Sequence, residues 1–146
     1  MDYKLNFQFV PDSCWCSNLR TLLSKKQWDF IRQDAKKRSF NTCSICGAKP
    51  KRLEAHEVWE YDEKNKTQIL VDVISVCKDC HSVIHYGRTS IKGDAERAEN
   101  HFMKVNNCSY VQMREQLGIA NLQHKKRNEI NEWKLDLTWL QRFIKE

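Results

Sequence analysis

Two short stretches decide the fold expected for this chain: CSIC at residues 43–46 and CKDCHSVIH at residues 77–85. Each begins with two cysteines in the spacing Cys-x-x-Cys, and Gly47 after the first pair permits the tight turn of a zinc knuckle. Four thiolates are soft ligands that complete a tetrahedron around zinc and leave no open position. We therefore predict a structural Zn²⁺ ion bound by Cys43, Cys46, Cys77 and Cys80.

Two other chemistries use paired cysteines, a redox dithiol and an iron–sulfur cluster. A redox dithiol is typical of a thioredoxin-like βαβ unit. The first residues, MDYKLNFQFV, lack the basic and apolar regions of a signal peptide, so we expect a cytoplasmic, intracellular protein. Because that compartment keeps thiols reduced, the paired cysteines indicate a metal and not disulfides, and zinc is the interpretation we favour over both alternatives.

The 30 residues between the two cysteine pairs predict a β-hairpin. Residues 52–61, RLEAHEVWEY, form its first strand, and because side chains alternate along a strand, His56 and Glu57 point to opposite faces. The polar residues 62–66 form the turn, and the β-branched residues 68–76 form the returning strand. Knuckle, hairpin, knuckle and helix then follow one another in the order of a treble clef.

Helices are expected on both sides of this core. SKKQ at residues 24–27 is a capping box that starts a helix running to about Arg38. SYVQ at residues 109–112 is a second capping box, and we expect its helix to end at Gly118. Gly87 is expected to end the helix that follows the second knuckle.

The length of 146 residues predicts one domain, and its class is α+β. We expect a small treble-clef ββα-metal core with structural zinc, wrapped by flanking helices. Residues 1–23 would be an N-terminal arm that packs Trp15 and Leu19, residues 24–90 the zinc-knuckle core, and residues 91–146 a helical C-terminal wrap.

Composition limits the classes of partner. The chain has 25 Lys+Arg against 19 Asp+Glu, a net charge of +6, together with five Trp, four Tyr and six Phe. This aromatic content is typical of a folded chain. The basic charge is compatible with a nucleic-acid partner, because cations that neutralise phosphates release counterions. The longest uncharged apolar run, residues 69–71, is too short for a membrane span, so we expect no membrane partner.

Three histidines predict a second metal site. His81 and His85 are spaced i, i+4, which places both imidazoles on one helical face, and His56 lies on the strand expected to face that helix. Neutral imidazole is a common ligand of catalytic divalent ions, and three ligands leave coordination positions open. The alternatives are that His81 only supports the zinc ligands and that His85 is an ordinary surface residue. Glu54 and Glu60, on the strand face of His56, are interpreted as solvated charges.

These residues resemble the HNH endonucleases, also called His-Me finger or ββα-metal nucleases, and in particular their zinc-knuckle, treble-clef subset. The resemblance covers residues 38–88 and consists of C-x-x-C, then LEAHEV, then C-x-x-C-H-x-x-x-H. The whole chain is also similar to a group of phage and prophage HNH-like proteins. That similarity lies in CWCSNLR (14–20), HEVWEYDE (56–63), SVCKDCHSVIHYG (75–87) and WKLDLTWL (133–140).

The resemblance implies roles for particular residues. It gives His56, His81 and His85 the positions that bind the divalent metal. Glu57 takes the position of the general base, which is His in the family, and Asp72 takes the position of an Asn that orients the base or the loop. A Glu can act as a base if its pKa is raised. In the alternative register His56 is the base and Ala55 stands at the metal-ligand position.

Basic residues gather around the first knuckle. KKR at residues 36–38 precedes it, and further cations follow it and the second histidine pair. Arginine can hold a phosphate through two parallel hydrogen bonds. We predict a phosphate-binding surface formed by Lys49, Lys51, Arg52 and Arg88.

Two functions follow as hypotheses. The first is a metal-dependent DNA endonuclease, in which Mg²⁺ or another divalent ion on the histidines polarises the scissile phosphate and Glu57, or a water that it orients, supplies the base for hydrolysis. The second is a nuclease-derived zinc module that binds nucleic acid or a host protein without cleavage. The departures at Glu57 and Asp72 motivate the second hypothesis.

Overall fold

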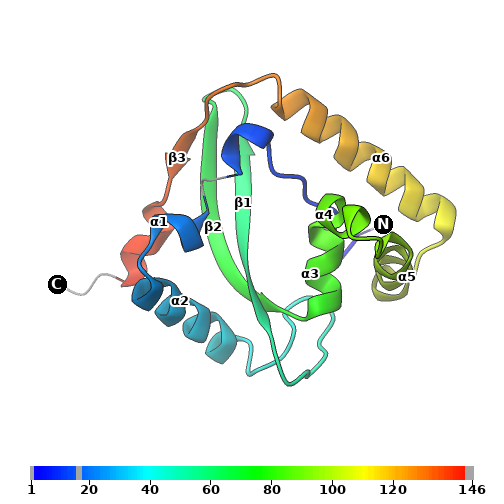
Figure 1. The fold of residues 1–146 in the computed structure, drawn as a ribbon, viewed down its shortest axis with the longest axis horizontal. Helices are drawn as coiled ribbons and strands as arrows, with labels where there is room; N and C mark the ends of the chain where they lie inside the picture. The colour runs from blue at the N-terminus through cyan, green and yellow to red at the C-terminus, as the bar shows by residue number, and fades with distance from the viewer. Residues whose placement is uncertain (1, 16–17, 144–146) are drawn as a thin grey trace.

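The computed structural model of the protein describes residues 2–15 and 18–143. Its centre is a three-stranded sheet in the order β1-β2-β3 (Figure 1). β1 (Glu54–Asp62) and β2 (Thr67–Val76) form the antiparallel hairpin expected between the cysteine pairs. β3 (Lys134–Asp136) runs parallel to β2 at the sheet edge. Together with the helices around it, this sheet confirms the α+β class.

Helices precede and follow the hairpin in the chain. In the described part of the chain no helix combines the length and the apolar character needed to cross a membrane. The helical elements are η1 (Asp12–Cys14), α1 (Leu19–Leu22), α2 (Lys25–Arg38), α3 (Lys78–Ile84), α4 (Tyr86–Ile91), α5 (Ala95–Asn106), α6 (Tyr110–Arg127) and η2 (Thr138–Phe143).

The sheet is covered on both faces, by α2 on one side and by α3 on the other (Figure 1). On the first side, Trp28 and Ile31 of α2 pack with Leu70 and Val73 of β2 and with Trp139 of η2. These residues are all less than about a tenth exposed, and each fully buried large side chain contributes about 1.5–3 kcal/mol by leaving water. This core therefore fixes one face of the hairpin and leaves the opposite face to α3.

A second core lies beneath α3 and joins segments far apart in the chain. Val83 and Ile84 of α3 pack with Phe102 of α5, and Leu5 and Phe7 of the N-terminal segment enter the same cluster. The rings of Phe7 and Phe102 stack with their centroids 4.5 Å apart. Burial of these side chains from three segments holds α3 in place against the hairpin.

Both capping boxes predicted from the sequence are present. The Ser24 hydroxyl accepts from Gln27 N at the start of α2, and the Ser109 hydroxyl accepts from Gln112 N at the start of α6. In each case the glutamine side chain accepts from the backbone N–H of the serine. These reciprocal bonds satisfy amides that have no partner within the helix, which explains why both helices begin where expected.

Three local expectations are wrong. α3 ends at Ile84, with His85 as its C-cap, so Gly87 lies inside α4 and does not end a helix. Gly118 lies inside α6, because burial of Met113 and Leu117 outweighs the cost of about 1 kcal/mol for glycine within a helix. Trp15 is 66% exposed and does not pack in the core, whereas Leu19, expected beside it, is fully buried.

Candidate metal centres

The four cysteines meet where the first knuckle touches the start of α3. In the knuckle, Gly47 adopts a φ of +79° and donates its N–H to Cys43 O at 3.0 Å. That backbone conformation favours glycine, and it closes the turn that carries Cys43 and Cys46. Cys77 is the N-cap of α3 and Cys80 lies in the first turn of that helix. Loop and helix therefore contribute two sulfurs each.

The spacing of the sulfurs matches a tetrahedral zinc site. The four ligand atoms lie within 4.8 Å of one another. Zn–S bonds of about 2.3 Å in a tetrahedron place any two sulfurs about 3.8 Å apart, and Cys46 Sγ lies 3.7 Å from Cys77 Sγ. A disulfide would need about 2.05 Å. The donor set and its spacing thus fit a Zn²⁺ ion.

Crowding of the four thiols makes one acidic and others resistant to ionisation. A hydrogen bond from the Cys80 thiol is the main cause that lowers the pKa of Cys43 to about 4. The same bond raises the pKa of Cys80, and burial raises the pKa of Cys77 to about 11. The cluster alone therefore favours one thiolate, and four thiolates at neutral pH require a cation among them.

One residue outside the sequence motif touches this cluster. His101 of α5 places Nε2 3.2 Å from Cys80 Sγ. An imidazole N–H that donates to a ligand sulfur orients the ligand and balances part of its negative charge. The sequence analysis did not find His101, because no motif surrounds it and the contact forms only when α5 packs on α3.

The three predicted histidines come together on the α3 side of the sheet. His56 projects from β1, His81 lies in α3, and His85 is the residue at which α3 ends. The ligand atoms of the three imidazoles lie within 4.8 Å of one another. Ring centroids are 5.6 Å apart between His56 and each of the other two, and 4.6 Å apart between His81 and His85. A strand and a helix thus build a three-nitrogen cluster.

Two further side chains hold these rings. The carboxylate of Glu54 lies 2.5 Å from His81 Nδ1, and Oε1 of Gln8 lies 3.1 Å from His56 Nε2. Metal-binding histidines usually donate the second ring N–H to a carboxylate or carbonyl oxygen. With Nδ1 of His81 and Nε2 of His56 donating in this way, the other ring nitrogens keep free lone pairs. The arrangement therefore fits a divalent ion.

The histidine cluster is neutral at pH 7. Burial, followed by the charges of His85 and His81, lowers the pKa of His56 to about 3. Burial, followed by the charges of His81 and Arg88, lowers the pKa of His85 to about 4. Neutral imidazoles are the form that binds metal ions.

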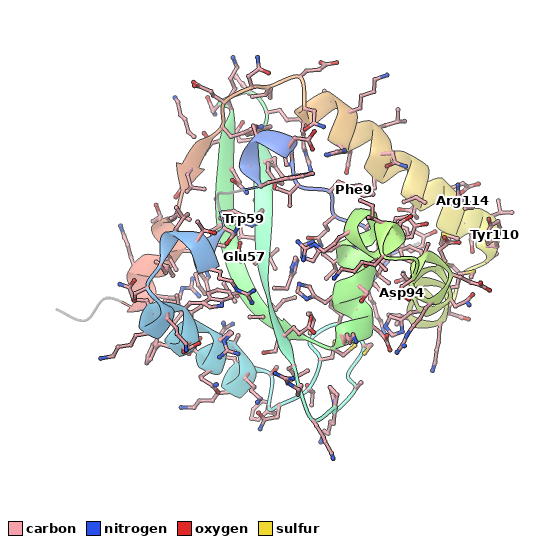
Figure 2. The ribbon with its side chains drawn as sticks, in the orientation of Figure 1. Phe9, Glu57, Trp59, Asp94, Tyr110 and Arg114 are labelled. Atoms are coloured by element: carbon pink, nitrogen blue, oxygen red, sulfur yellow. The ribbon has the colours of Figure 1, made fainter. Side chains whose placement is uncertain are left out.

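Glu57 does not join the histidines. In Figure 2 it lies with Trp59 on the side of the hairpin that faces α1, away from α3. Its carboxylate accepts from the backbone N–H of Leu19 at 2.9 Å and from the indole N–H of Trp59 at 3.2 Å. Burial raises the pKa of Glu57, and these two bonds oppose the shift. The placement corrects the expectation of a base beside the histidines, since successive residues of β1 point to opposite faces.

Asp72 also lies outside the histidine cluster. Its Oδ1 accepts from Arg38 Nη1 at 3.3 Å and from the backbone N–H of Val73 at 2.8 Å. The strand pairing shifts next to it, between Val58 and Trp59 of β1. Asp72 therefore anchors the end of α2 to β2, and its assignment as the residue that orients a base is not supported by its contacts.

The predicted cations divide into two groups. Arg88 is exposed in α4, and its charge acts on His85, which places it beside the histidine cluster. Lys49, Lys51 and Arg52 are exposed in the loop between the first knuckle and β1. Arg52 lines a groove beside the cysteines. Arg88 is thus the cation placed to meet a phosphate at the histidines.

The residues that sequence reasoning missed differ in how they could have been found. Glu54 stands two positions before His56 on the same strand face, so the alternation of β1 already placed it at the site. Gln8 and His101 offered no such signal, because their contacts cross 48 and 21 residues of sequence. They depend on how the N-terminal segment and α5 pack around α3.

Comparisons with known protein families, with curated proteins and with solved structures gave no match. The firm structural result is a mixed α+β fold with four cysteines placed to bind a metal ion. Function is therefore inferred from the geometry of the two clusters.

Proposed function

We propose that the protein is a metal-dependent DNA endonuclease of the HNH, or ββα-metal, type, built on a treble-clef zinc core. The order of knuckle, β1, β2, second knuckle and α3 supports the proposal. The observation that carries it is the cluster of His56, His81 and His85, whose ligand atoms lie within 4.8 Å of one another. Three neutral nitrogens on rigid elements form a site with open positions, as a catalytic metal requires.

Each residue has a distinct task in this proposal. When bound by the three histidines, a divalent ion supplies Lewis-acid stabilisation of charge on the scissile phosphate. Glu54 and Gln8 fix the rings of His81 and His56 through their hydrogen bonds. Arg88 binds a phosphate oxygen next to His85, because its guanidinium is exposed and close to that ring.

A second function is favoured by the positions of Glu57 and Asp72. Both carboxylates are occupied by hydrogen bonds on other parts of the sheet. The residues that stand at the family's base and orienting positions therefore do not reach the histidines. The alternative function is a nuclease-derived zinc module that binds nucleic acid or a host protein without cleaving it.

A nicking assay tests the endonuclease. Supercoiled plasmid is incubated with the wild-type protein and Mg²⁺, Mn²⁺ or Ni²⁺, and with the variants His56→Ala and His85→Ala. We expect nicking by the wild type and a loss of at least about tenfold in each variant, since each removes a metal ligand. His124→Ala is the control, because His124 packs on Phe9 outside the cluster. Equal nicking by His56→Ala and the wild type contradicts the proposal.

Metal binding separates the two functions. Titration calorimetry of the zinc-loaded protein with Mn²⁺ should show one further ion in the wild type and none in His85→Ala. A bound ion without nicking of any DNA favours the zinc module. If no ion binds beyond the zinc, the histidine cluster is not a metal site.

A further inference from the structure

We propose that a basic groove between the first knuckle and α5 binds the phosphodiester backbone of the nucleic acid and leads it to the histidine cluster. The inference rests on the proposed function and deepens it by placing the substrate. The groove has a volume of about 690 Å³ and lies beside Cys46 and Cys77. Five cations line it, contributed by four separate segments of the chain: Lys4, Arg52, Lys78, Arg97 and Lys104.

The positive charge of the groove is largely uncompensated. Among the described residues that line it, Asp79 is the one carboxylate, and it lies 3.0 Å from Arg97. Within the described ranges, the ion pairs include none made by Lys4, Lys78 or Lys104. On α2, by contrast, Arg32 and Arg38 each meet a carboxylate. A concave surface with several unpaired cations attracts a polyanion.

Lys78 connects the groove to the histidines. At 3.6 residues per turn, residues i, i+3 and i+7 share one helical face. Lys78 and His81 therefore lie on the same face of α3, and His85 continues that face at the helix end. The rise from residue 78 to 85 is about 10 Å, and one DNA strand carries a phosphate every 3.4 Å or so along the axis. A run of about three phosphates spans groove and cluster.

Another use of these cations is possible on electrostatic grounds, and it yields the opposite result in a direct test. Four thiolates and one Zn²⁺ carry a net charge of −2, and Cys46 and Cys77 border the groove. Cations that served only to balance the zinc site would affect zinc retention and not DNA binding. Both quantities are therefore measured on the same variants.

The test variant replaces the three unpaired lysines of the groove, Lys4→Gln, Lys78→Gln and Lys104→Gln, in the full-length zinc-loaded protein. A matched control replaces three exposed lysines elsewhere, Lys26→Gln, Lys64→Gln and Lys125→Gln, and changes the net charge equally. Fluorescence anisotropy measures binding to a labelled 25-base-pair duplex and to its single strand over a salt series. No divalent ion is added, so binding is measured apart from cleavage.

We expect the groove variant to bind at least about tenfold more weakly at low salt, because it loses phosphate contacts. The slope of log affinity against log salt should flatten by up to about 2.7 on the duplex or about 2 on the single strand. The larger change identifies which form follows the groove. The control variant should keep the wild-type slope.

Three results would overturn the proposal. The first is an equal loss in both triple variants, which would indicate net charge alone. The second is unchanged DNA binding with faster release of zinc to a chelator, which would assign the lysines to the zinc site. The third is displacement of the DNA by polyglutamate at equal charge concentration, which would indicate an acidic protein as partner. DNA binding in the groove without nicking would instead retain the groove and reject the endonuclease.

Discussion

The cysteine cluster and the histidine cluster share α3 but differ in burial and in surroundings. Cys43, Cys77 and Cys80 are all less than a tenth exposed, and four sulfurs fill the coordination sphere of a zinc ion. In the histidine cluster His56 is buried, whereas the side chain of His81 is 21% exposed and the ligands number three. One cluster is closed and the other is open.

The shared helix makes the two clusters unequal partners. Cys77 and Cys80 begin α3, and His81 and His85 lie further along it. The position of His81 therefore depends on the start of the helix, which the cysteines hold. The fold around the cysteines does not need the histidines in the same way, because Val83 and Ile84 of α3 are buried in a core of their own. Damage should pass from the first cluster to the second and not in reverse.

The largest expected effect is that of Cys80→Ser. Structural zinc contributes about 10–16 kcal/mol in small zinc domains, which matches or exceeds the whole stability of about 5–15 kcal/mol of an ordinary domain. We expect loss of zinc, loss of a cooperative thermal melt, and loss of divalent-ion binding at the histidines. Metal analysis by mass spectrometry and thermal melting measure these outcomes.

Cys108→Ser is the control for that experiment, because Cys108 is a free, half-buried cysteine outside the cluster. It should keep the zinc and the melting temperature to within a few degrees. A cooperative melt of Cys80→Ser at the wild-type temperature would show that the zinc site does not hold α3, and the unequal dependence of the clusters would be wrong.

His101→Ala should have the next largest effect, and only on the closed cluster. Removing the partner of a metal ligand typically lowers metal affinity by 10- to 100-fold, and His101 Nε2 lies 3.2 Å from Cys80 Sγ. Zinc transfer to a coloured chelator should accelerate accordingly. His101→Gln should restore part of the affinity, because its amide N–H can also donate to sulfur. Unchanged zinc release in His101→Ala would make the contact incidental.

Sequence reasoning succeeded where the controlling interaction is local. The cysteine spacing, the two capping boxes and the alternation of the hairpin all act within a few residues. The alternation even placed His56 and Glu57 on opposite faces, whereas the resemblance to the HNH family assigned both to one site. The structure agrees with the alternation, because a regular strand at this point cannot turn two successive side chains to one face.

Contacts between distant segments were out of reach of the sequence. Gln8 meets His56 only because the N-terminal segment packs over α3, where Gln8 N donates to Ile84 O at 3.0 Å. Gly118 was expected to end a helix, yet Met113 and Leu117 are buried on the preceding turns and hold α6 together. Local propensity of about 1 kcal/mol decides a helix end only where packing does not.

Glu57→Ala separates the two faces of β1. The variant leaves the buried N–H of Leu19 and the indole N–H of Trp59 without their acceptor, which costs about 1–3 kcal/mol of stability. Because the histidines lie on the other face, divalent-ion affinity and nicking should stay at the wild-type level. Urea unfolding and the metal titration measure the two effects, with Glu60→Ala, an exposed carboxylate of the same strand, as control. A loss of nicking without a loss of stability would restore Glu57 as the base.

The smallest expected effect is that of Gln8→Ala on the open cluster. The Gln8 amide oxygen lies 3.1 Å from His56 Nε2 and holds the buried ring in one orientation. A hydrogen bond of this kind contributes a net 0.5–1.5 kcal/mol or so, so Mn²⁺ affinity should fall by up to about tenfold while zinc retention is unchanged. Asn6→Ala is the control, because Asn6 is exposed on the same segment and bonds only locally, to Tyr3 O. Tighter Mn²⁺ binding in Gln8→Ala would mean that Gln8 occupies the nitrogen that the ion needs, and that the N-terminal segment closes the site instead of supporting it.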